Sequence, residues 1–199
     1  MNSITIIRAT CRRPQTRDGM LVGFVGPAGA GKTTATNGMW GGWTSTYPER
    51  WTRHRFAEPL KAMLGHLGLT DRHTDGDLKE APCDLLGGKT PRWAMQTLGT
   101  EWGRNLIYPE LWFDAWRRTL PGGNVVVDDC RFPNEADAIR ALGGVIVRIA
   151  RPGYGAGGHP SEAQEVEEDA LVTNVGTVLE LARAASAAVH RLYQLPEMT

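Results

Sequence analysis

The residues whose types and spacing carry the clearest chemistry form a glycine-rich run from Gly26 to Thr33. The run reads Gly-Pro-Ala-Gly-Ala-Gly-Lys-Thr and matches the pattern G-x-x-x-x-G-K-[ST] in full. Glycines at these positions let backbone N–H groups turn toward one point, and a helix that starts directly afterwards adds its positive N-terminal end. The run therefore predicts a phosphate-binding loop for ATP. The residues expected to contact the nucleotide are Gly26, Ala28, Gly29, Ala30, Gly31, Lys32, Thr33 and Thr34.

The lysine and the threonine that end this run have separate expected roles. Lys32 is expected to reach the β- and γ-phosphates as a catalytic residue, and the Thr33 hydroxyl is expected to bind Mg²⁺. An apolar strand pattern over Leu21–Val25 precedes the run, and a helical pattern from Lys32 to about Trp40 follows it. This context favours a nucleotide site over a chance glycine turn.

A second candidate is the carboxylate pair Asp128 and Asp129, which follows the apolar run Val125–Val127. In proteins with such a loop, a carboxylate at the end of a central strand holds Mg²⁺ or receives the proton of the acceptor. A turn or helix-cap aspartate is the alternative. Because neighbouring strand residues point to opposite sides, we expect one functional and one structural carboxylate. Both are catalytic candidates, and Asp128 is a candidate metal ligand.

Arginines outside the loop are candidates because a guanidinium group binds phosphate bidentately and neutralises charge during phosphoryl transfer. Arg131 follows the aspartates closely and is expected at the same sheet edge. Arg148 and Arg151 flank the end of a later strand, and Arg151 is a further catalytic candidate. For each single arginine, a solvated surface charge is the alternative.

A polar stripe is predicted on a later helix, where Arg92, Gln96, Thr100 and Arg104 recur at steps of four residues. Such steps place side chains along one helix face. Amide, hydroxyl and guanidinium groups on one face suit the base, sugar and phosphate of a nucleotide. An ordinary solvent-facing stripe is the alternative.

Alternating strand and helix patterns supply the framework that must position these side chains. Strands are expected at Leu21–Val25, Trp51–Phe56, Asn124–Val127, Val145–Ile149 and Ala170–Thr173. Helices are expected at Lys32–Trp40, Ala57–Leu67, Thr90–Ile107, Trp112–Arg118, Asn134–Leu142 and Val175–Tyr193. This alternation predicts an α/β fold with a parallel sheet and helices on both faces.

The same patterns predict a main domain over residues 20–199 that contains a helical region at 57–120. The polar stretch Thr70–Lys89 in that region is expected to be a mobile or variable surface segment. Residues 1–19 form an N-terminal extension with three open interpretations: a disordered arm, an edge strand at Ile4–Ile7, or sequence upstream of the real start at Met20. The first is favoured because the first strong core pattern begins after Met20.

Composition and charge argue against several other classes of protein. The 199 residues include 22 basic and 22 acidic side chains, and a net charge of zero argues against stable nucleic-acid binding. No apolar run reaches the about 20 residues that cross a bilayer, and the Arg-rich N-terminus lacks the apolar segment of a secretory signal. The cysteines Cys11, Cys83 and Cys130 are far apart and predict free thiols in a reducing cytoplasm.

Several stretches together resemble the bacteriophage deoxynucleoside monophosphate kinases, a branch of the nucleoside monophosphate kinases. They are Gly26–Thr34, Phe56–Lys61, Gln96–Asn105 (Gln-Thr-Leu-Gly-Thr-Glu-Trp-Gly-Arg-Asn), Asp128–Glu135 (Asp-Asp-Cys-Arg-Phe-Pro-Asn-Glu) and, more weakly, His159–Glu162. The likeness extends from Leu21 to the C-terminus. The third and fourth stretches narrow it, because many families share the first.

The resemblance implies a three-layer P-loop kinase fold, with a small helical acceptor-binding cap at about 57–120 and a short lid at about 151–165. It implies transfer of the γ-phosphoryl group from ATP, with Mg²⁺, to a deoxynucleoside monophosphate. It places Lys61, Glu101 and the polar stripe in the acceptor site, Arg131 at the transferring or acceptor phosphate, and Arg151 in the lid. It also implies a protein of the host cytoplasm, and small kinases of this kind are often homodimers.

Two features depart from the wider nucleoside monophosphate kinase pattern. The expected lid has one clear arginine where larger lids carry several, and residues 1–19 have no obvious place in the fold. Two other functions stay in play: another small-molecule P-loop kinase, resembling dephospho-coenzyme A kinase, and an ATPase module that uses ATP as a switch. Zero net charge and the lack of a glutamate after Asp129 count against the switch module.

Overall fold

A computed structural model describes residues 2–7, 18–40, 50–154 and 166–194 of the chain. The chain divides into two compact units. We call Met1–Arg55 together with Pro121–Thr199 the P-loop unit, and Phe56–Leu120 the helical unit. The helical unit begins within one residue of the helical region that the sequence predicts.

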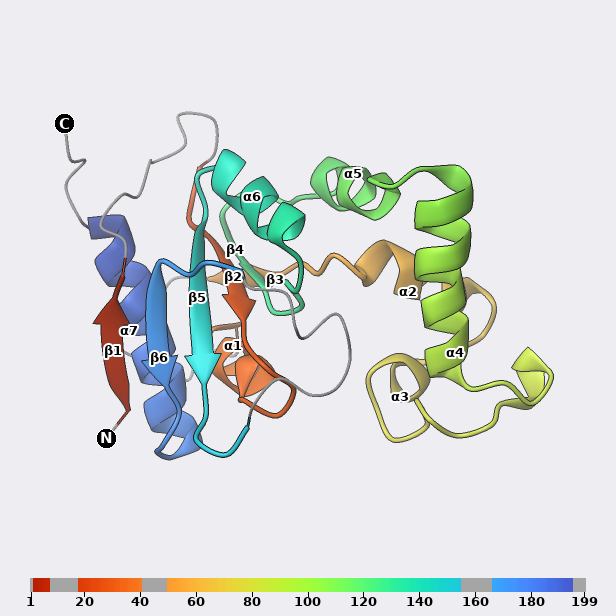
Figure 1. Cartoon of the computed structure of the whole chain (residues 1–199), viewed down its shortest axis with the longest axis horizontal. Helices are drawn as coiled ribbons and strands as arrows, with labels where there is room; N and C mark the ends of the chain where they lie inside the picture. The colour runs from red at the N-terminus through yellow and green to blue at the C-terminus, as the bar shows by residue number, and fades with distance from the viewer. Residues whose placement is uncertain (1, 8–17, 41–49, 155–165, 195–199) are drawn as a thin grey trace. The chain divides into compact units, whose positions relative to one another are not determined.

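The P-loop unit is built on a sheet of six strands in the order β1-β6-β5-β2-β4-β3. The strands are β1 Ser3–Ile6, β2 Leu21–Val25, β3 Trp51–Arg53, β4 Asn124–Val127, β5 Val145–Ala150 and β6 Ala170–Thr173. All neighbouring pairs are parallel except β1 and β6, which are antiparallel (Figure 1). Parallel neighbours need long crossover connections, and the helices between the strands supply them.

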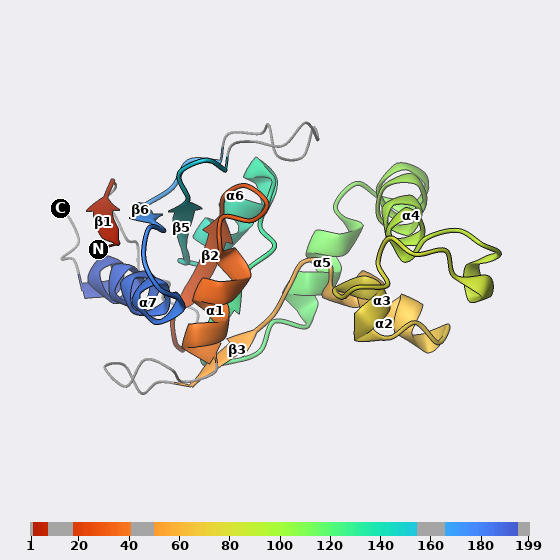
Figure 2. The same ribbon diagram turned by 90° about the horizontal axis from the view of Figure 1, so that it is seen from below.

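Helices cover both faces of this sheet. The helices α1 (Lys32–Trp40) and α7 (Val178–Gln194) lie side by side on one face, and α6 (Pro133–Ala141) lies on the other (Figure 2). The predicted three-layer α/β fold is confirmed, with the antiparallel edge strand β1 as an addition.

The main core lies between the sheet and the layer of α1 and α7, where Phe24, Ile149 and Leu181 are buried. Every residue of β2 is buried, which explains why its sequence reads as an unbroken apolar run without polar alternation. Gly23 lets α6 approach the strand closely. A Cβ at this position would lie 2.6 Å from a methyl group of Ile139, so a larger residue would push α6 away.

The N-terminal residues Ser3–Ile6 form an edge strand, so the favoured interpretation of a disordered arm is wrong for them. They pair with β6, and Ile4 and Ile6 pack against the main core. This apolar contact fixes the register of a strand that has no other neighbour. Residues 8–17 lie outside the described residues.

Two predicted elements differ from those observed by three residues at one end. The strand β3 ends at Arg53 and not at Phe56, because the Phe56 ring packs against Trp116 of the helical unit, with ring centroids 4.4 Å apart. The last helix begins at Val178 and not at Val175. Thr177 caps it, since its Oγ1 accepts a hydrogen bond from Glu180 N and its N donates one to the Glu180 carboxylate.

The helical unit has a smaller core of its own. Its elements are α2 Glu58–His66, α3 Asp71–Thr74, η1 Asp84–Leu86, α4 Pro91–Gln96, η2 Thr97–Ile107 and α5 Leu111–Arg118. The buried core residues are Leu60, Leu64, Leu69, Ala94 and Trp112. The polar stretch Thr70–Lys89, expected to be a surface segment, contains the two short helices α3 and η1.

The predicted helix start at Thr90 is confirmed, because Trp93 N donates to Thr90 Oγ1 at 3.1 Å. The winding then changes within the predicted helix. The α-helix α4 continues directly into η2, a π-helix of 11 residues whose wider turn is visible in the bond from Tyr108 N to Gly103 O at 2.9 Å.

A tryptophan from α5 packs into this π-helix. Trp112 Nε1 donates to Gly99 O at 2.7 Å, and a Cβ on Gly103 would lie 2.6 Å from ring atom Cε2 of the same tryptophan. One indole ring therefore packs against two glycines four residues apart, and we call this contact the indole seat. π-Helical turns occur often at functional sites, and this one covers the stretch that carries the family resemblance.

The described cysteines agree with the sequence-based expectation. Cys83 and Cys130 are free thiols, and Cys11 lies outside the described residues. Burial raises the pKa of the Cys130 thiol well above its usual value, which keeps it protonated and unreactive. Within the described ranges, no helix is long and apolar enough to span a bilayer.

Candidate active site

The glycine-rich run forms a tight loop between β2 and α1. Gly26, Gly29 and Gly31 have φ angles of 136°, 76° and 105°, a backbone region that residues with a Cβ rarely adopt. Gly31 is also crowded, because a Cβ would lie 2.7 Å from Asn174 Nδ2 and 2.9 Å from Leu181 Cδ2. The pattern of glycines is therefore required by the loop conformation and by its neighbours.

Lys32 lies across its own loop. Its ammonium donates to Gly26 O at 2.5 Å and to Pro27 O at 3.0 Å. A phosphate group in the loop would compete with these two carbonyls for the ammonium, since a charged acceptor forms the stronger bond. Thr33 is exposed at the first turn of α1, where a hydroxyl can reach a metal ion bound to phosphate oxygens.

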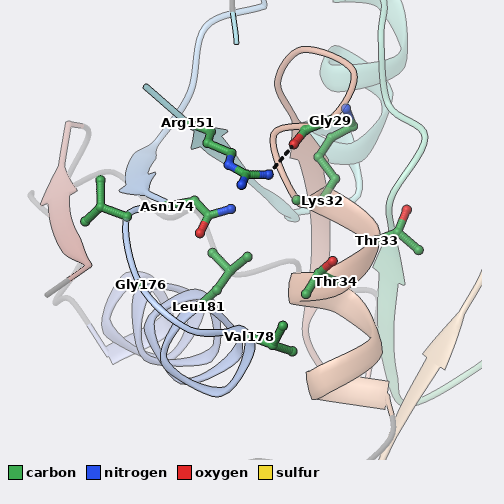
Figure 3. Close-up of a pocket in the computed structure, with 11 residues that line it drawn as sticks. Gly29, Lys32, Thr33, Thr34, Arg151, Asn174, Gly176, Val178 and Leu181 are labelled. Carbon is green, nitrogen blue, oxygen red and sulfur yellow. Dashed lines mark hydrogen bonds between the residues drawn. The ribbon is translucent and has the colours of Figure 1, made fainter. Parts of the chain in front are cut away.

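A cavity of about 490 Å³ opens beside the loop. Its lining residues are Gly29, Gly31, Lys32, Thr33, Thr34, Arg151, Asn174, Val175, Gly176, Val178 and Leu181. The first turn of α1 and the start of α7 face each other across it, and Arg151 reaches toward the loop (Figure 3). The cavity joins a phosphate-binding end to an apolar end, which is the shape a nucleotide needs.

The connection from β6 to α7 forms one wall of this cavity. Asn174 Nδ2 donates to Ala30 O at 2.9 Å, which ties the connection to the phosphate loop. Val175 and Val178 then present exposed apolar side chains at the cavity. The hydrogen bonds from Thr177 that cap α7 lower the pKa of the Glu180 carboxyl, so Glu180 is ionised and this end of the helix carries a negative charge.

Arg151 is held over the loop by two contacts. Its Nη1 donates to Gly29 O at 3.4 Å, and its guanidinium lies 4.5 Å from the centre of the Tyr154 ring. The same ring covers the loop, since a Cβ on Gly29 would lie 2.6 Å from Tyr154 Cε1. Arg151 and Tyr154 thus form a short clamp on the phosphate loop, and the rest of the predicted lid, residues 155–165, lies outside the described residues.

The adjacent carboxylates have different surroundings. Asp128 is buried, and its Oδ1 accepts from Arg55 Nε at 2.9 Å. Its Oδ2 lies 3.4 Å from Thr36 Oγ1 and 3.9 Å from Arg53 Nη1. Asp129, the next residue, is only partly buried.

Arg131 lies at the same edge of the sheet as the aspartates, as its position in the sequence predicts. Its backbone N donates to the buried carboxylate of Glu135 at 2.8 Å, while its side chain is exposed. Glu135 also accepts from Phe132 N at 3.2 Å, and it fixes the turn that leads into α6. The turn is therefore rigid, and the Arg131 guanidinium projects from it into solvent.

The predicted acceptor residues other than Arg131 belong to the helical unit. Lys61 pairs with Asp75 at 2.5 Å, and Arg92 pairs with Glu80. Gln96, Thr100 and Glu101 are exposed, and Arg104 is partly buried. The change to π-helical winding after Gln96 alters the spacing that the four-residue stripe assumed.

The structure therefore brings together Lys32, Thr33, Thr34 and Arg151 around one cavity. Sequence reasoning missed Asn174 at this cavity, Tyr154 against Gly29 of the loop, and Thr36 and Arg55 at Asp128. Asn174 stands where a strand ends and a helix follows, the place where ligands bind in open α/β sheets, and that signal was available. The others have no local pattern. Among the described residues, no group of three or more His, Cys, Asp or Glu side chains could hold a metal ion by itself.

Fold and site together define a class. A parallel sheet, a glycine loop with lysine and threonine at the start of α1, and a nucleotide-sized cavity beside them are the features of a P-loop nucleotide-binding protein. No family model matches the sequence.

Sequence similarity to one relative identifies a family within this class. The chain is 37% identical over 165 residues to a protein of Acanthamoeba polyphaga mimivirus whose name assigns it to the deoxynucleotide monophosphate kinases. The match covers 73% of this chain and 81% of the relative. The chain therefore belongs to the deoxynucleotide monophosphate kinase family, and the predicted resemblance is confirmed at this level.

Proposed function

We propose that this protein transfers the γ-phosphoryl group of ATP to a deoxynucleoside monophosphate and releases ADP and the deoxynucleoside diphosphate. The observation that carries the proposal is the cavity beside the phosphate loop, where Lys32, Thr33 and Arg151 meet in a chain of this family. The polar and apolar ends of that cavity match the triphosphate and the base of the donor.

ATP is the donor, and its phosphates lie in the loop from Gly26 to Thr33. The loop fits a phosphate group, because its three glycines with positive φ allow backbone N–H groups to point toward the phosphate oxygens. Mg²⁺ would be held by the Thr33 hydroxyl together with phosphate oxygens and water, and it supplies charge neutralisation. The base would lie toward Val175 and Val178 at the start of α7.

The acceptor binds through the helical unit. Arg92, Gln96, Thr100, Glu101 and Arg104 supply hydrogen-bonding groups to it, and Lys61 supplies a further cation. The ion pairs that Lys61 and Arg92 make with Asp75 and Glu80 are surface pairs of small net energy. An anionic acceptor can therefore displace them at little cost.

In the transfer, an oxygen of the acceptor phosphate forms a bond to the γ-phosphorus while the bond from that phosphorus to the bridging oxygen of ADP breaks. Negative charge moves toward the bridging oxygen. Lys32, Arg151 and Arg131 neutralise it, and the backbone of the loop holds the donor still. The clamp of Arg151 and Tyr154 helps to keep water from the γ-phosphorus, where it would compete with the acceptor.

The predictions about cellular location, nucleic-acid binding and oligomeric state belong to the same proposal. We propose a bacteriophage-type enzyme of the host cytoplasm that acts without stable nucleic-acid binding and possesses a homodimeric form. Equilibrium sedimentation at micromolar concentration would test the dimer, and a monomer throughout would contradict it.

The experiment is an assay of ADP release with ATP, Mg²⁺ and each deoxy- and ribonucleoside monophosphate separately. We expect rapid release with at least one deoxynucleotide and little without an acceptor. Release that needs dephospho-coenzyme A, or that proceeds without any acceptor, would instead assign the protein to another P-loop kinase or to an ATPase module.

A further inference from the structure

The two neighbouring carboxylates at the end of β4 are chemically equivalent in the sequence, but their surroundings in the structure differ. Asp128 has a side chain that is 3% exposed and is engaged on both oxygens. Asp129 follows it at the point where the chain leaves the strand and is only partly buried. The contacts of Asp128 decide between them.

The Oδ1 atom of Asp128 accepts from Arg55 Nε at 2.9 Å, and the Arg55 side chain is itself only 14% exposed. A second guanidinium, that of Arg53, lies 3.9 Å from Oδ2 and donates to Asn37 Oδ1 at 3.3 Å. One carboxylate thus faces two cations. A carboxylate neutralised in this way inside the protein is a poor ligand for a divalent ion, because the ion would have to displace the arginines.

The third contact of Asp128 shows which part of α1 it reaches. Thr36 Oγ1 lies 3.4 Å from Asp128 Oδ2 and 3.1 Å from Thr33 O, and Thr36 is fully buried. Thr36 stands three residues beyond Thr33, which is about 4.5 Å further along the helix axis. Asp128 therefore contacts the second turn of α1, at a residue about one helical turn beyond Thr33.

We infer that Asp128 is a positioning residue that ties α1 to the ends of β3 and β4, and that Asp129 supplies the carboxylate for the metal ion or the acceptor. The first half stands on the contacts of Asp128 alone, and the second half rests on the proposed function. Arg55 is the last residue of the first segment of the P-loop unit. Its pair with Asp128 thus also fixes the point where the chain leaves that unit.

The stability of four proteins tests the first half: wild type, Asp128→Asn, Arg55→Gln and the double variant. Removing one partner leaves a buried charge unpaired, so each single change should lower Tm by about 10 °C. The double variant should lose clearly less than the sum of the two. Asp137→Asn is the control, because Asp137 is a 77% exposed partner of Arg140 at 3.8 Å and its loss should leave Tm unchanged.

The second half is tested by calorimetric titration of ATP with and without Mg²⁺, beside the turnover assay. At a temperature where it remains folded, Asp129→Asn should lose more than about 100-fold in kcat and most of the Mg²⁺-dependent gain in ATP affinity. Asp128→Asn should keep that gain at a temperature well below its Tm.

Two results would overturn the inference. One is an Asp128→Asn protein with wild-type Tm that has lost its Mg²⁺-dependent ATP affinity. The other is strictly additive stability losses for Asp128 and Arg55. Neither depends on the choice of acceptor, so failure of the proposed kinase reaction, seen as no deoxynucleotide-dependent turnover in wild type, remains distinguishable from failure of this inference.

Discussion

The P-loop unit and the helical unit prepare their candidate binding residues in different ways. In the P-loop unit the central strands β2, β4 and β5 are largely buried. Several exposed apolar side chains, those of Tyr154, Val175 and Val178, lie at the phosphate loop or its cavity. The helical unit has a smaller core and leaves many large apolar side chains exposed. These are Met63, Leu67, Leu85, Trp93, Trp102, Leu106, Ile107 and Tyr108.

The contacts of the charged residues also differ between the two units. Lys32 and Arg151 of the P-loop unit contact backbone carbonyls of the loop itself, so they are already placed for a phosphate. Lys61 and Arg92 of the helical unit pair with neighbouring carboxylates on the surface. Under the proposed function, the donor side would be preorganised by the core beneath it, whereas the acceptor side would have to exchange ion pairs before it can bind. Changes at the two sides should accordingly differ in kind.

The largest effect is expected at the donor side from Lys32→Ala. The γ-phosphoryl group would lose its main cationic partner, so kcat should fall by about 10³-fold or more. The circular dichroism spectrum and Tm should stay near those of wild type, because Lys32 contributes no core contact. Retained turnover in a well-folded variant would contradict the role of the loop.

A smaller effect, on stability, is expected in the helical unit from Gly103→Ala. The new methyl group would collide with the Trp112 ring, and such overpacking costs about 1–3 kcal/mol. Gly65→Ala is the matched control, since Gly65 is exposed in α2 with open space around its Cβ position, and alanine there should stabilise by up to about 1 kcal/mol. Chemical denaturation measures both. Equal effects of the two changes would show that the indole seat is not rigid.

The acceptor side is tested by Arg104→Ala, which should raise the KM for the deoxynucleoside monophosphate by about tenfold through loss of one charge-assisted hydrogen bond. The KM for ATP should not change. Arg118→Ala on α5 serves as a control for a general loss of positive charge in the same unit. If Arg104→Ala raised only the KM for ATP, the assignment of the helical unit to the acceptor would be wrong.

The smallest effect is expected from Tyr154→Leu, which removes the ring under Arg151. An exposed cation–π contact contributes about 0.5–1 kcal/mol, so the KM for ATP should rise about two- to fivefold. Tyr154→Phe keeps the ring and should restore the wild-type value. A loss in both variants would assign the function to the hydroxyl group and not to the ring.

Local sequence patterns predicted those parts of the molecule whose conformation depends on near neighbours in the chain. The strand Leu21–Val25 was predicted at its observed bounds, because a fully buried strand reads as an unbroken apolar run. The strands Asn124–Val127 and Ala170–Thr173 were also predicted at their observed bounds. The helix start at Thr90 was predicted from its cap residue. The phosphate loop was predicted from its glycines, which its backbone conformation requires. Expectations for the roles of Arg92, Gln96, Thr100 and Arg131 stay predictions.

Long-range pairing escaped the sequence. The strand β1 was left open because it forms only by joining β6, about 165 residues later in the chain. The π-helical winding of Thr97–Ile107 is linked to the indole of Trp112, which no helical periodicity indicates. Tyr154 meets Gly29 only because β5 ends beside the loop.

The sequence by itself determined the phosphate-binding loop, since this loop is encoded in eight consecutive residues and needs only a strand before it and a helix after it. Only the tertiary structure distinguished Asp128 from its neighbour. Arg55 and Thr36 lie 73 and 92 residues away along the chain, and a carboxylate has the character that its partners give it. Chemistry that depends on local backbone shape can be read from one segment, whereas chemistry that depends on charge and burial requires the assembled fold.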